Sequence, residues 1–162
     1  PGRATQMNLG ASFAKGEYVV FLHADTDPDF SEEEFSDKLL FSTIWGFFRV
    51  RLSGEKNIYK VISSLINKRS EITSVCSGDQ MIFVRRAVFD ALGGYGDLPL
   101  MEDIYLSKQL RVISKPQIMS FRVVSSSRRW EEHGVIKTIV LMWILRFAYF
   151  CGVSPSAFKK FY

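Results

Sequence analysis

The chain has 162 residues, a formal net charge of +4 and 47% hydrophobic residues, a composition that fits one globular domain and excludes a disordered chain. The basic residues are scattered, with neither zinc-finger spacing nor the aromatic pattern of RNA-binding sheets, so we expect no nucleic-acid partner. The surplus of positive charge fits either simple solubility or an anionic partner such as a diphosphate or an acidic lipid. Cys76 and Cys151 stand alone, which predicts two buried thiols rather than structural zinc.

Helices and strands alternate along the first half of the chain. Apolar residues recur at helical spacing in residues 2–15, and Gly16 stands where a C-terminal cap glycine would end that helix. The apolar run Glu17–His23 is typical of a strand buried in a parallel sheet. Ser31 and Glu34 form a capping-box pattern. In order we expect a helix over 2–15, a strand over 17–23, a loop over 25–29, a helix over 31–40, a strand over 45–52 and a helix over 57–68.

The second half of the chain continues this alternation. We expect a strand over 81–85, a helix over 87–92 that Gly93 and Gly94 end, a loop over 95–101, a helix over 103–112, a strand over 118–124, a helix over 131–151 and a final short helix from Ser154 and Pro155. No repeat or linker interrupts the pattern, so residues 1–162 are predicted to form a single α/β domain. Because the chain starts at Pro1 with a helix already in progress, we expect the strands that normally precede it to be missing.

The stretch from Val135 to Val153 is mostly apolar, and three interpretations of it remain open. A broad apolar face would pack on the core, and it consists of Ile136, Ile139, Val140, Trp143, Ile144 and Phe147. A membrane span is the second interpretation, but Lys137 and Arg146 interrupt the run, and arginine near the centre of a span is costly. The third is an interfacial helix that touches anionic lipid, with Lys137 and Arg146 at its border.

Acidic residues follow the predicted strand over 17–23. In open α/β sheets, ligands bind beyond the carboxyl ends of strands. A carboxylate there, at Asp25, would hold Mg²⁺ or Mn²⁺, which prefer oxygen ligands and share them with phosphates. The alternative is an acidic turn whose aspartates only cap the next helix. His23 is either a further ligand or a structural residue at the end of the strand.

Two further polar pairs stand at the ends of predicted elements. Glu102 and Asp103 lie where a loop enters a helix, and Asp103 is either an N-cap or a general base that accepts a proton from a hydroxyl group. Arg129 and Trp130 join a strand to the long helix. Arginine binds phosphate bidentately and tryptophan stacks on flat groups, but a basic turn with a half-buried tryptophan explains the pair equally well.

In chain order, the segments His23-Ala24-Asp25-Thr26, Gly78-Asp79-Gln80, Glu102-Asp103 and Arg129-Trp130 resemble the family-2 inverting glycosyltransferases. The resemblance is greatest to a small bacterial branch often found beside radical-SAM genes, and it extends from Gly2 to Tyr162. It implies a GT-A fold, which is a Rossmann-like open mixed sheet flanked by helices, here N-terminally truncated and with a long C-terminal helix. It also implies a nucleotide-sugar donor, a small-molecule or lipid-linked acceptor, and Mg²⁺ or Mn²⁺ as cofactor.

The resemblance also implies a role for each matching position. Asp25 matches the last aspartate of the Asp-x-Asp metal motif, with His23 in place of the first, and Asp103 matches the catalytic base, with Glu102 beside it. Gly78, Asp79 and Gln80 match the strand start that faces the acceptor and the donor sugar, Arg129 and Trp130 match the end of the Gln-x-x-Arg-Trp motif, and Arg3 and Asn8 match the helix after the nucleotide-binding strands. Ser126 stands where that motif has glutamine, so we do not expect a processive polysaccharide synthase.

We therefore expect a metal-assisted transfer of a sugar, with inversion, from a nucleoside diphosphate sugar to a hydroxyl group. A nucleotidyltransferase and a catalytically inactive membrane-surface interaction module are the alternatives. We expect a cytoplasmic location, and leave open both peripheral contact with the inner face of the membrane and homo-oligomerisation.

Overall fold

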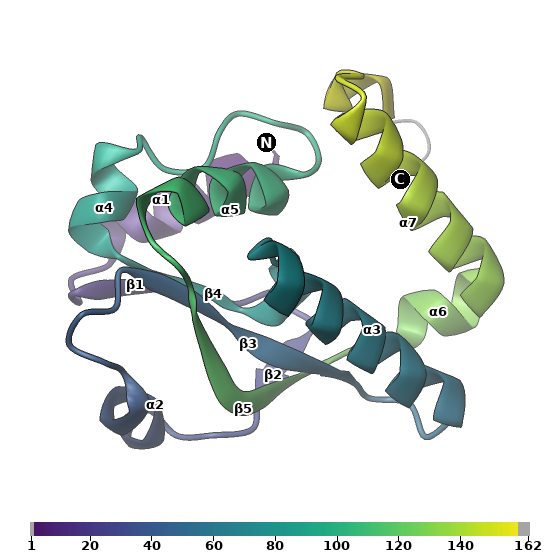
Figure 1. The fold of residues 1–162 in the computed structure, drawn as a ribbon, viewed down its shortest axis with the longest axis horizontal. Helices are drawn as coiled ribbons and strands as arrows, with labels where there is room; N and C mark the ends of the chain where they lie inside the picture. Colours follow the sequence, from purple (N-terminus) through teal and green to yellow (C-terminus); the bar gives the residue numbers. More distant parts are fainter. Residues whose placement is uncertain (1, 159–162) are drawn as a thin grey trace.

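The computed structural model describes residues 2–158, which form a five-stranded mixed sheet with helices packed around it (Figure 1). The strands are β1 (Tyr18–Phe21), β2 (Thr26–Pro28), β3 (Trp45–Leu52), β4 (Ile82–Arg85) and β5 (Gln117–Ser125). The helices are α1 (Arg3–Phe13), α2 (Glu32–Lys38), α3 (Asn57–Thr73), α4 (Arg86–Ala91), α5 (Glu102–Ile113), α6 (Arg128–His133) and α7 (Val135–Phe150), with 3₁₀ turns η1 (Gly78–Gln80) and η2 (Pro155–Phe158). The predicted α/β class is confirmed, while Pro1 and residues 159–162 of the expected domain lie outside the described residues.

The direction of the strands brings several chain segments to one end of the sheet. The strand order is β1-β4-β3-β5-β2, in which β3 and β5 are parallel and the other neighbours are antiparallel. The last residues of β1, β3 and β5 therefore lie at the same end as the first residues of β2 and β4, and we call this the carboxyl end of the sheet. Since β1 and β2 are opposite edge strands joined by residues 22–25, this short segment crosses the carboxyl end.

Two strand predictions were wrong in part. The segment 17–23 contains β1, but β1 is an edge strand antiparallel to β4 rather than a buried strand of a parallel sheet, and 37% of Val20 is exposed. The expected loop over 25–29 contains β2, which pairs with residues 123–125 of β5. Pairing with a distant strand makes this acidic segment extended, a tertiary effect that local propensity does not reveal.

Most helices lie where the sequence predicts them, and their ends show which of the predicted capping residues begin or end a helix. Ser31 Oγ accepts a hydrogen bond from Glu34 N at 3.2 Å, and Ser31 N donates to the Glu34 carboxylate at 2.8 Å, which confirms the capping box at the start of α2. The first helix ends at Phe13 with Ala14 already extended, so Gly16 is not its cap. The predicted helix over 131–151 is two helices, because Gly134 between them has φ 81°, a conformation that favours glycine.

Apolar side chains cover both faces of the sheet. On one face, α1, α4 and α5 pack on the strands through Ala4, Phe89, Leu106 and Leu110, which contact a cluster of Val19, Phe21, Trp45, Phe47, Ile82 and Val84. On the other face, Phe30 just before α2 and Phe35 within α2 pack on Phe48, Phe83 and Phe121. The Phe30 and Phe48 rings stack with centroids 4.6 Å apart. Eight of the 14 phenylalanines lie in these two layers.

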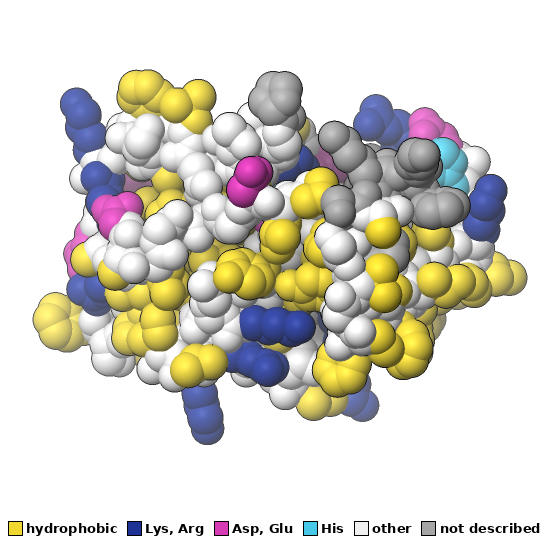
Figure 2. Space-filling model, turned by 90° about the horizontal axis from the view of Figure 1, so that it is seen from above, with side chains coloured by type: hydrophobic (Ala, Val, Ile, Leu, Met, Phe, Trp, Pro, Cys, Tyr) yellow, Lys and Arg dark blue, Asp and Glu magenta, His cyan; other side chains and the backbone are white. Residues whose placement is uncertain are grey.

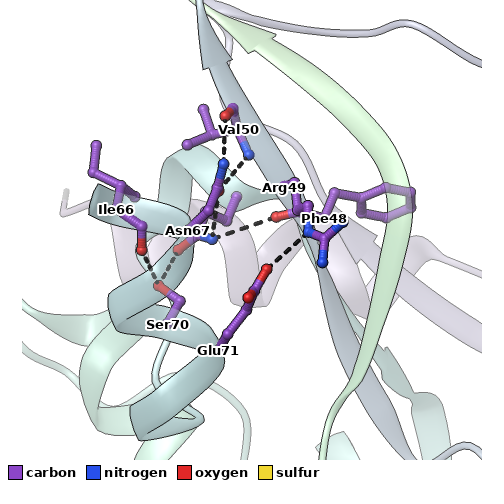
Figure 3. A network of polar contacts seen from close by, with 8 residues as sticks. Phe48, Arg49, Val50, Ile66, Asn67, Ser70 and Glu71 are labelled. Atoms are coloured by element: carbon purple, nitrogen blue, oxygen red, sulfur yellow. Dashed lines mark hydrogen bonds and ion pairs between the residues drawn. The ribbon is translucent and has the colours of Figure 1, made fainter. Parts of the chain in front are cut away.

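A polar network holds α3 and η1 against β3 (Figure 3). The side chain of Asn67 accepts from Val50 N and donates to Val50 O, both at 2.9 Å. Gln80 is fully buried, accepts from the Ser70 hydroxyl at 2.6 Å and donates to Phe48 O at 3.4 Å. These contacts fix η1 at the carboxyl end of the sheet.

The last long helix, α7, packs through a narrow line of residues. Leu145 is buried against Leu100, Met101 and Ile104, with Leu141, Ala148 and Tyr149 beside it. The predicted core face is wrong, since Ile136 is 79%, Trp143 76% and Phe147 71% exposed. The helix is apolar on nearly every side, so its periodicity does not indicate which line faces the protein. Within residues 2–158, no helix combines the length and apolar character that a membrane crossing needs.

Candidate functional site

Three segments that are distant in the sequence meet at the carboxyl end of the sheet. His23, just after β1, places its Nδ1 3.6 Å from Asp79 Oδ1 in η1. The next contact joins η1 to α5, because Gly78 N donates to the carboxylate of Asp103 at 2.6 Å. The side chains at positions 23, 79 and 103 therefore form one polar cluster at this end.

The turn between β5 and α6 lies at the same end. Ser126 N donates to Asp25 O at 3.0 Å, which joins this turn to the segment that crosses the sheet. Asp25 itself is exposed, and the charge of Arg129 contributes to lowering the pKa of Asp79. The predicted residues Asp25, Asp103 and Arg129 thus lie at one end of the fold rather than on different faces.

Asp103 occupies the second position of α5 and is partly buried. Its Oδ2 accepts from Gly78 N and its Oδ1 from Ile104 N at 2.8 Å. The N-cap of α5 is Met101, in a left-handed conformation with φ 68°, so Asp103 is not the N-cap. Burial and the negative charge of Glu102 raise the pKa of Asp103, and the two backbone hydrogen bonds offset only part of this. A carboxylate with a raised pKa accepts a proton more readily, which suits a general base.

The neighbouring pair of His23 and Asp79 favours the charged form of both side chains. Burial by itself would raise the pKa of Asp79, but the contact with His23 and the charges of Arg3 and Arg129 lower it overall. The same contact raises the pKa of His23 above its ordinary value of 6.5, against the effect of burial. Two carboxylates in one cluster therefore differ, with Asp79 the firmly ionised one and Asp103 the better proton acceptor.

The ring of His23 packs against η1. A Cβ added at Gly78 would overlap Cε1 and Nε2 of the ring, so the close approach requires glycine at this position. With its Nδ1 facing Asp79 and its other ring nitrogen against Gly78, His23 fits the structural role at the end of the strand, which was one of its two predicted alternatives.

The exposed carboxylate of Asp25 is the remaining candidate for a metal. No group of three His, Cys, Asp or Glu side chains that could hold a metal occurs in the part of the chain that the structure describes. Magnesium often binds through only one or two protein carboxylates, with substrate phosphates and water completing its coordination. Asp25 fits that mode, and does not fit a site built from protein ligands alone.

Two grooves reach this polar cluster. The first, about 880 Å³, runs between α1 and β1 to residues 22–25, and we call it the α1–β1 groove. Arg3, His23, Asp25 and Arg128 line its end. Arg3 also forms an ion pair with Glu102 at 2.7 Å, which fixes the guanidinium beside the cluster. The groove therefore offers two cations and one exposed carboxylate to an anionic ligand.

The second groove, about 620 Å³, lies between α3, α6 and α7, and we call it the α3–α7 groove. Its walls are mostly apolar, and they include Ile62, Ile66, Trp130, Ile139, Trp143 and Phe147. Arg69, Arg146 and Asp79 provide its polar part. The α1–β1 groove thus contains His23 and the α3–α7 groove contains Asp79, so the two grooves meet at the His23–Asp79 pair.

Several predicted site residues have structural roles instead. Glu102 is 1% exposed and binds Arg3, so it does not reach a substrate. The amide of Asn8 donates to Tyr95 O and accepts from Tyr95 N, both at 2.8 Å. Asn8 therefore holds the loop before α5 in place and does not hold a nucleotide-sugar donor. Gln80 is fully buried in the α3–β3 network and does not face a sugar. Trp130 lines the α3–α7 groove, and not the α1–β1 groove that contains Arg3 and Arg128.

Three arginines of the grooves were not among the predicted site residues. Arg128, next to the predicted Arg129, lines the α1–β1 groove. Arg69 and Arg146 each follow apolar residues of the same groove at helical spacing, Ile62 and Ile66 in α3, and Ile139 and Met142 in α7. An arginine at helical spacing from an apolar stripe was the signal that could have identified Arg69 and Arg146.

No protein-family model matches the chain, and no curated protein sequence matches it. The functional conclusion therefore depends on the chemistry of the site. That chemistry combines a cationic groove, an apolar groove and a carboxylate of raised pKa, which is bound to the 3₁₀ turn where the two grooves meet.

Proposed function

We propose that the chain is an inverting glycosyltransferase, which transfers a sugar from a nucleoside diphosphate sugar to an acceptor hydroxyl group. The observation that carries the proposal is the meeting of two grooves at the His23–Asp79 pair, with Asp103 bound to the same 3₁₀ turn. A reaction between two substrates needs two binding sites that meet at the reacting groups. The mixed sheet, with the polar cluster at its carboxyl end, supports a GT-A fold, and this fold is part of the proposal.

The donor diphosphate would bind in the α1–β1 groove. Arg3 and Arg128 line this groove and bring positive charge to it. Guanidinium groups bind phosphate oxygens through paired hydrogen bonds and stabilise the charge that builds up on a leaving diphosphate. Asp25 would hold Mg²⁺ or Mn²⁺ at the same place, where the metal supplies further positive charge to the diphosphate.

Asp103 acts as the general base. Its carboxylate accepts the proton of the acceptor hydroxyl as the hydroxyl oxygen forms a bond to the anomeric carbon. The bond from that carbon to the diphosphate oxygen breaks in the same step, and the nucleoside diphosphate leaves. One displacement inverts the anomeric centre. Asp79 is less suited to this role because its pKa is lowered, whereas that of Asp103 is raised.

Turnover of the Asp103→Asn variant tests the proposal. Release of nucleoside diphosphate is measured over a panel of nucleotide sugars with Mn²⁺ and a set of candidate acceptors. We expect Asp103→Asn to lower kcat by about 100-fold or more, the usual contribution of a general base, while the variant still folds. Asp90→Asn, an exposed aspartate of α4, is the matched control and should keep full activity.

The pH profile provides a second readout. Because the pKa of Asp103 is raised above its ordinary 3.8, the acidic limb of kcat/KM should lie above that of an ordinary aspartate and vanish in Asp103→Asn. Transfer that survives Asp103→Asn undiminished would rule out this mechanism. The remaining alternative would then be the catalytically inactive membrane-surface interaction module, which the exposed apolar face of α7 favours.

A further inference from the structure

We propose that the α3–α7 groove binds a single amphiphilic molecule with a phosphate head group and one apolar chain. The head lies at Arg69 and Arg146, and the chain runs along the apolar walls towards the exposed surface of α7. That this molecule is the sugar acceptor rests on the proposed function, whereas its binding does not.

The walls of the groove match an apolar chain. Ile62, Leu65 and Ile66 of α3 form one wall and Ile139, Met142 and Phe147 of α7 the other, with Trp130 and Trp143 among the lining residues. The groove continues onto an exposed surface, since 61% of Leu65 and 71% of Phe147 are exposed. Figure 2 shows hydrophobic side chains gathered over α7 with lysine and arginine side chains nearby. Exposed apolar surface of this kind marks a binding site more often than a passive surface.

The polar end of the groove matches an anion. Arg69 is partly buried, and its Nε makes no hydrogen bond in the part of the chain that the structure describes. Arg146 lines the groove from the facing helix. Burial, followed by the positive charge of Arg146, lowers the pKa of Arg69 to about 10, so the guanidinium group of Arg69 remains charged at neutral pH. Two like charges that lie close together are stabilised when an anion binds both.

The overall charge of the groove favours the same ligand. Lys68, Arg69 and Arg146 line it, against the carboxylate of Asp79 in its lining and the negative charge of Asp103 near Arg69. A neutral lipid would cover the guanidinium groups without binding their charge, and free phosphate would leave the apolar walls exposed to water. A molecule that contains both parts matches the groove. Its head would lie near Asp79, which places an acceptor group beside the cluster that contains Asp103.

Binding of dodecyl phosphate to the full chain, below its micelle concentration, tests the inference. Calorimetry and the fluorescence of Trp130 and Trp143 report binding, while the fully buried Trp45 provides a constant background. We expect saturable binding, weaker by about ten-fold or more in Arg146→Gln and in Arg69→Gln. Lys60→Gln removes one charge from an exposed position of α3 outside the groove and should bind like the unmodified chain. Arg146→Gln keeps the test decisive if Arg69→Gln does not fold.

Three comparison ligands test whether the groove needs both parts of the amphiphile. Dodecyl maltoside, which has the same chain and a neutral head, should bind at least about ten-fold more weakly, and inorganic phosphate should not compete at equal concentration. Equal binding of dodecyl maltoside, or binding of phosphate alone, would overturn the inference. So would binding to anionic vesicles without binding to monomeric dodecyl phosphate, which indicates a membrane-surface contact. Asp103→Asn should still bind dodecyl phosphate, so a failure of catalysis and a failure of this site are distinguishable.

Discussion

The polar cluster at the carboxyl end of the sheet and the surface of α7 are built in opposite ways. In the cluster, each functional group is fixed by a partner from another element, as Asp103 is by Gly78 N and His23 is by Asp79. In α7, one buried line around Leu145 holds the helix, and most of its large apolar side chains stay exposed. The first arrangement suits chemistry, which needs fixed distances, and the second suits the capture of an apolar ligand.

This difference predicts where substitutions affect stability. Residues that support the cluster should lower the free energy of unfolding when they are changed, because their hydrogen bonds join separate elements. Exposed residues of α7 should leave stability unchanged and alter binding only. Single substitutions test this division, from the largest expected effect on stability to the smallest.

Asn67→Ala should have the largest effect. It leaves Val50 N and Val50 O without their side-chain partner and removes one of the links between α3 and β3. Each unpaired group that is shielded from water costs about 1–3 kcal/mol, so we expect a loss of about 2 kcal/mol or more in urea unfolding. Asn57→Ala, at an exposed position at the start of the same helix, should change stability by less than about 0.5 kcal/mol. Equal effects of the two substitutions would contradict the role of Asn67.

Gly78→Ala should have the next largest effect. The added methyl overlaps the His23 ring and must move it away from Asp79. Overpacking of this kind costs about 1–3 kcal/mol, and we place the loss in thermal unfolding near the lower end because a side chain can shift. Gly10→Ala in α1 is the control, since no atom lies within 4 Å of the added Cβ and alanine favours a helix by about 0.5–1 kcal/mol. A Gly78→Ala chain as stable as the control would show that the ring is not confined.

Local signals in the sequence predicted the elements that depend on near neighbours. The capping box at Ser31 and Glu34 needs only residues three positions apart, and it forms as expected. The glycines at 93 and 94, with φ of 76° and 78°, end α4 in the same way. By contrast, β2 depends on pairing with β5, almost a hundred positions later, and its acidic sequence contains no strand signal.

The candidate site shows the same limit. The position of polar residues after strands and before helices identified Asp25, Asp103 and Arg129 as candidates, and the three lie at one end of the fold. The role of each side chain depends on its partner across the fold, which spacing does not reveal. Asn8 therefore proved to bind Tyr95, and Glu102 to bind Arg3 out of contact with solvent.

His23→Gln should have a smaller effect that depends on pH. The pKa of His23 is raised in the folded state, so its pairing with Asp79 stabilises the fold fully below the unfolded value of 6.5 and is lost as pH rises through the folded pKa. The pKa of Asp79 is lowered, so the same pair also weakens as pH falls below about 3.8. The difference in unfolding free energy between the unmodified chain and His23→Gln should therefore be largest between these limits. A difference that stays constant from about pH 5 to about pH 9 would contradict the ion pair.

Trp143→Ala should have the smallest effect on stability and a clear effect on binding. The side chain is 76% exposed, so we expect a change of less than about 0.5 kcal/mol in unfolding free energy. Its ring lines the α3–α7 groove, and losing about 1.5 kcal/mol of apolar contact should weaken dodecyl phosphate binding about ten-fold in calorimetry. Phe13→Ala, an aromatic that is 75% exposed on α1 and outside both grooves, should change neither quantity. If Trp143→Ala instead destabilises the fold as much as Asn67→Ala, then α7 is part of the rigid framework and the contrast between the two regions is lost.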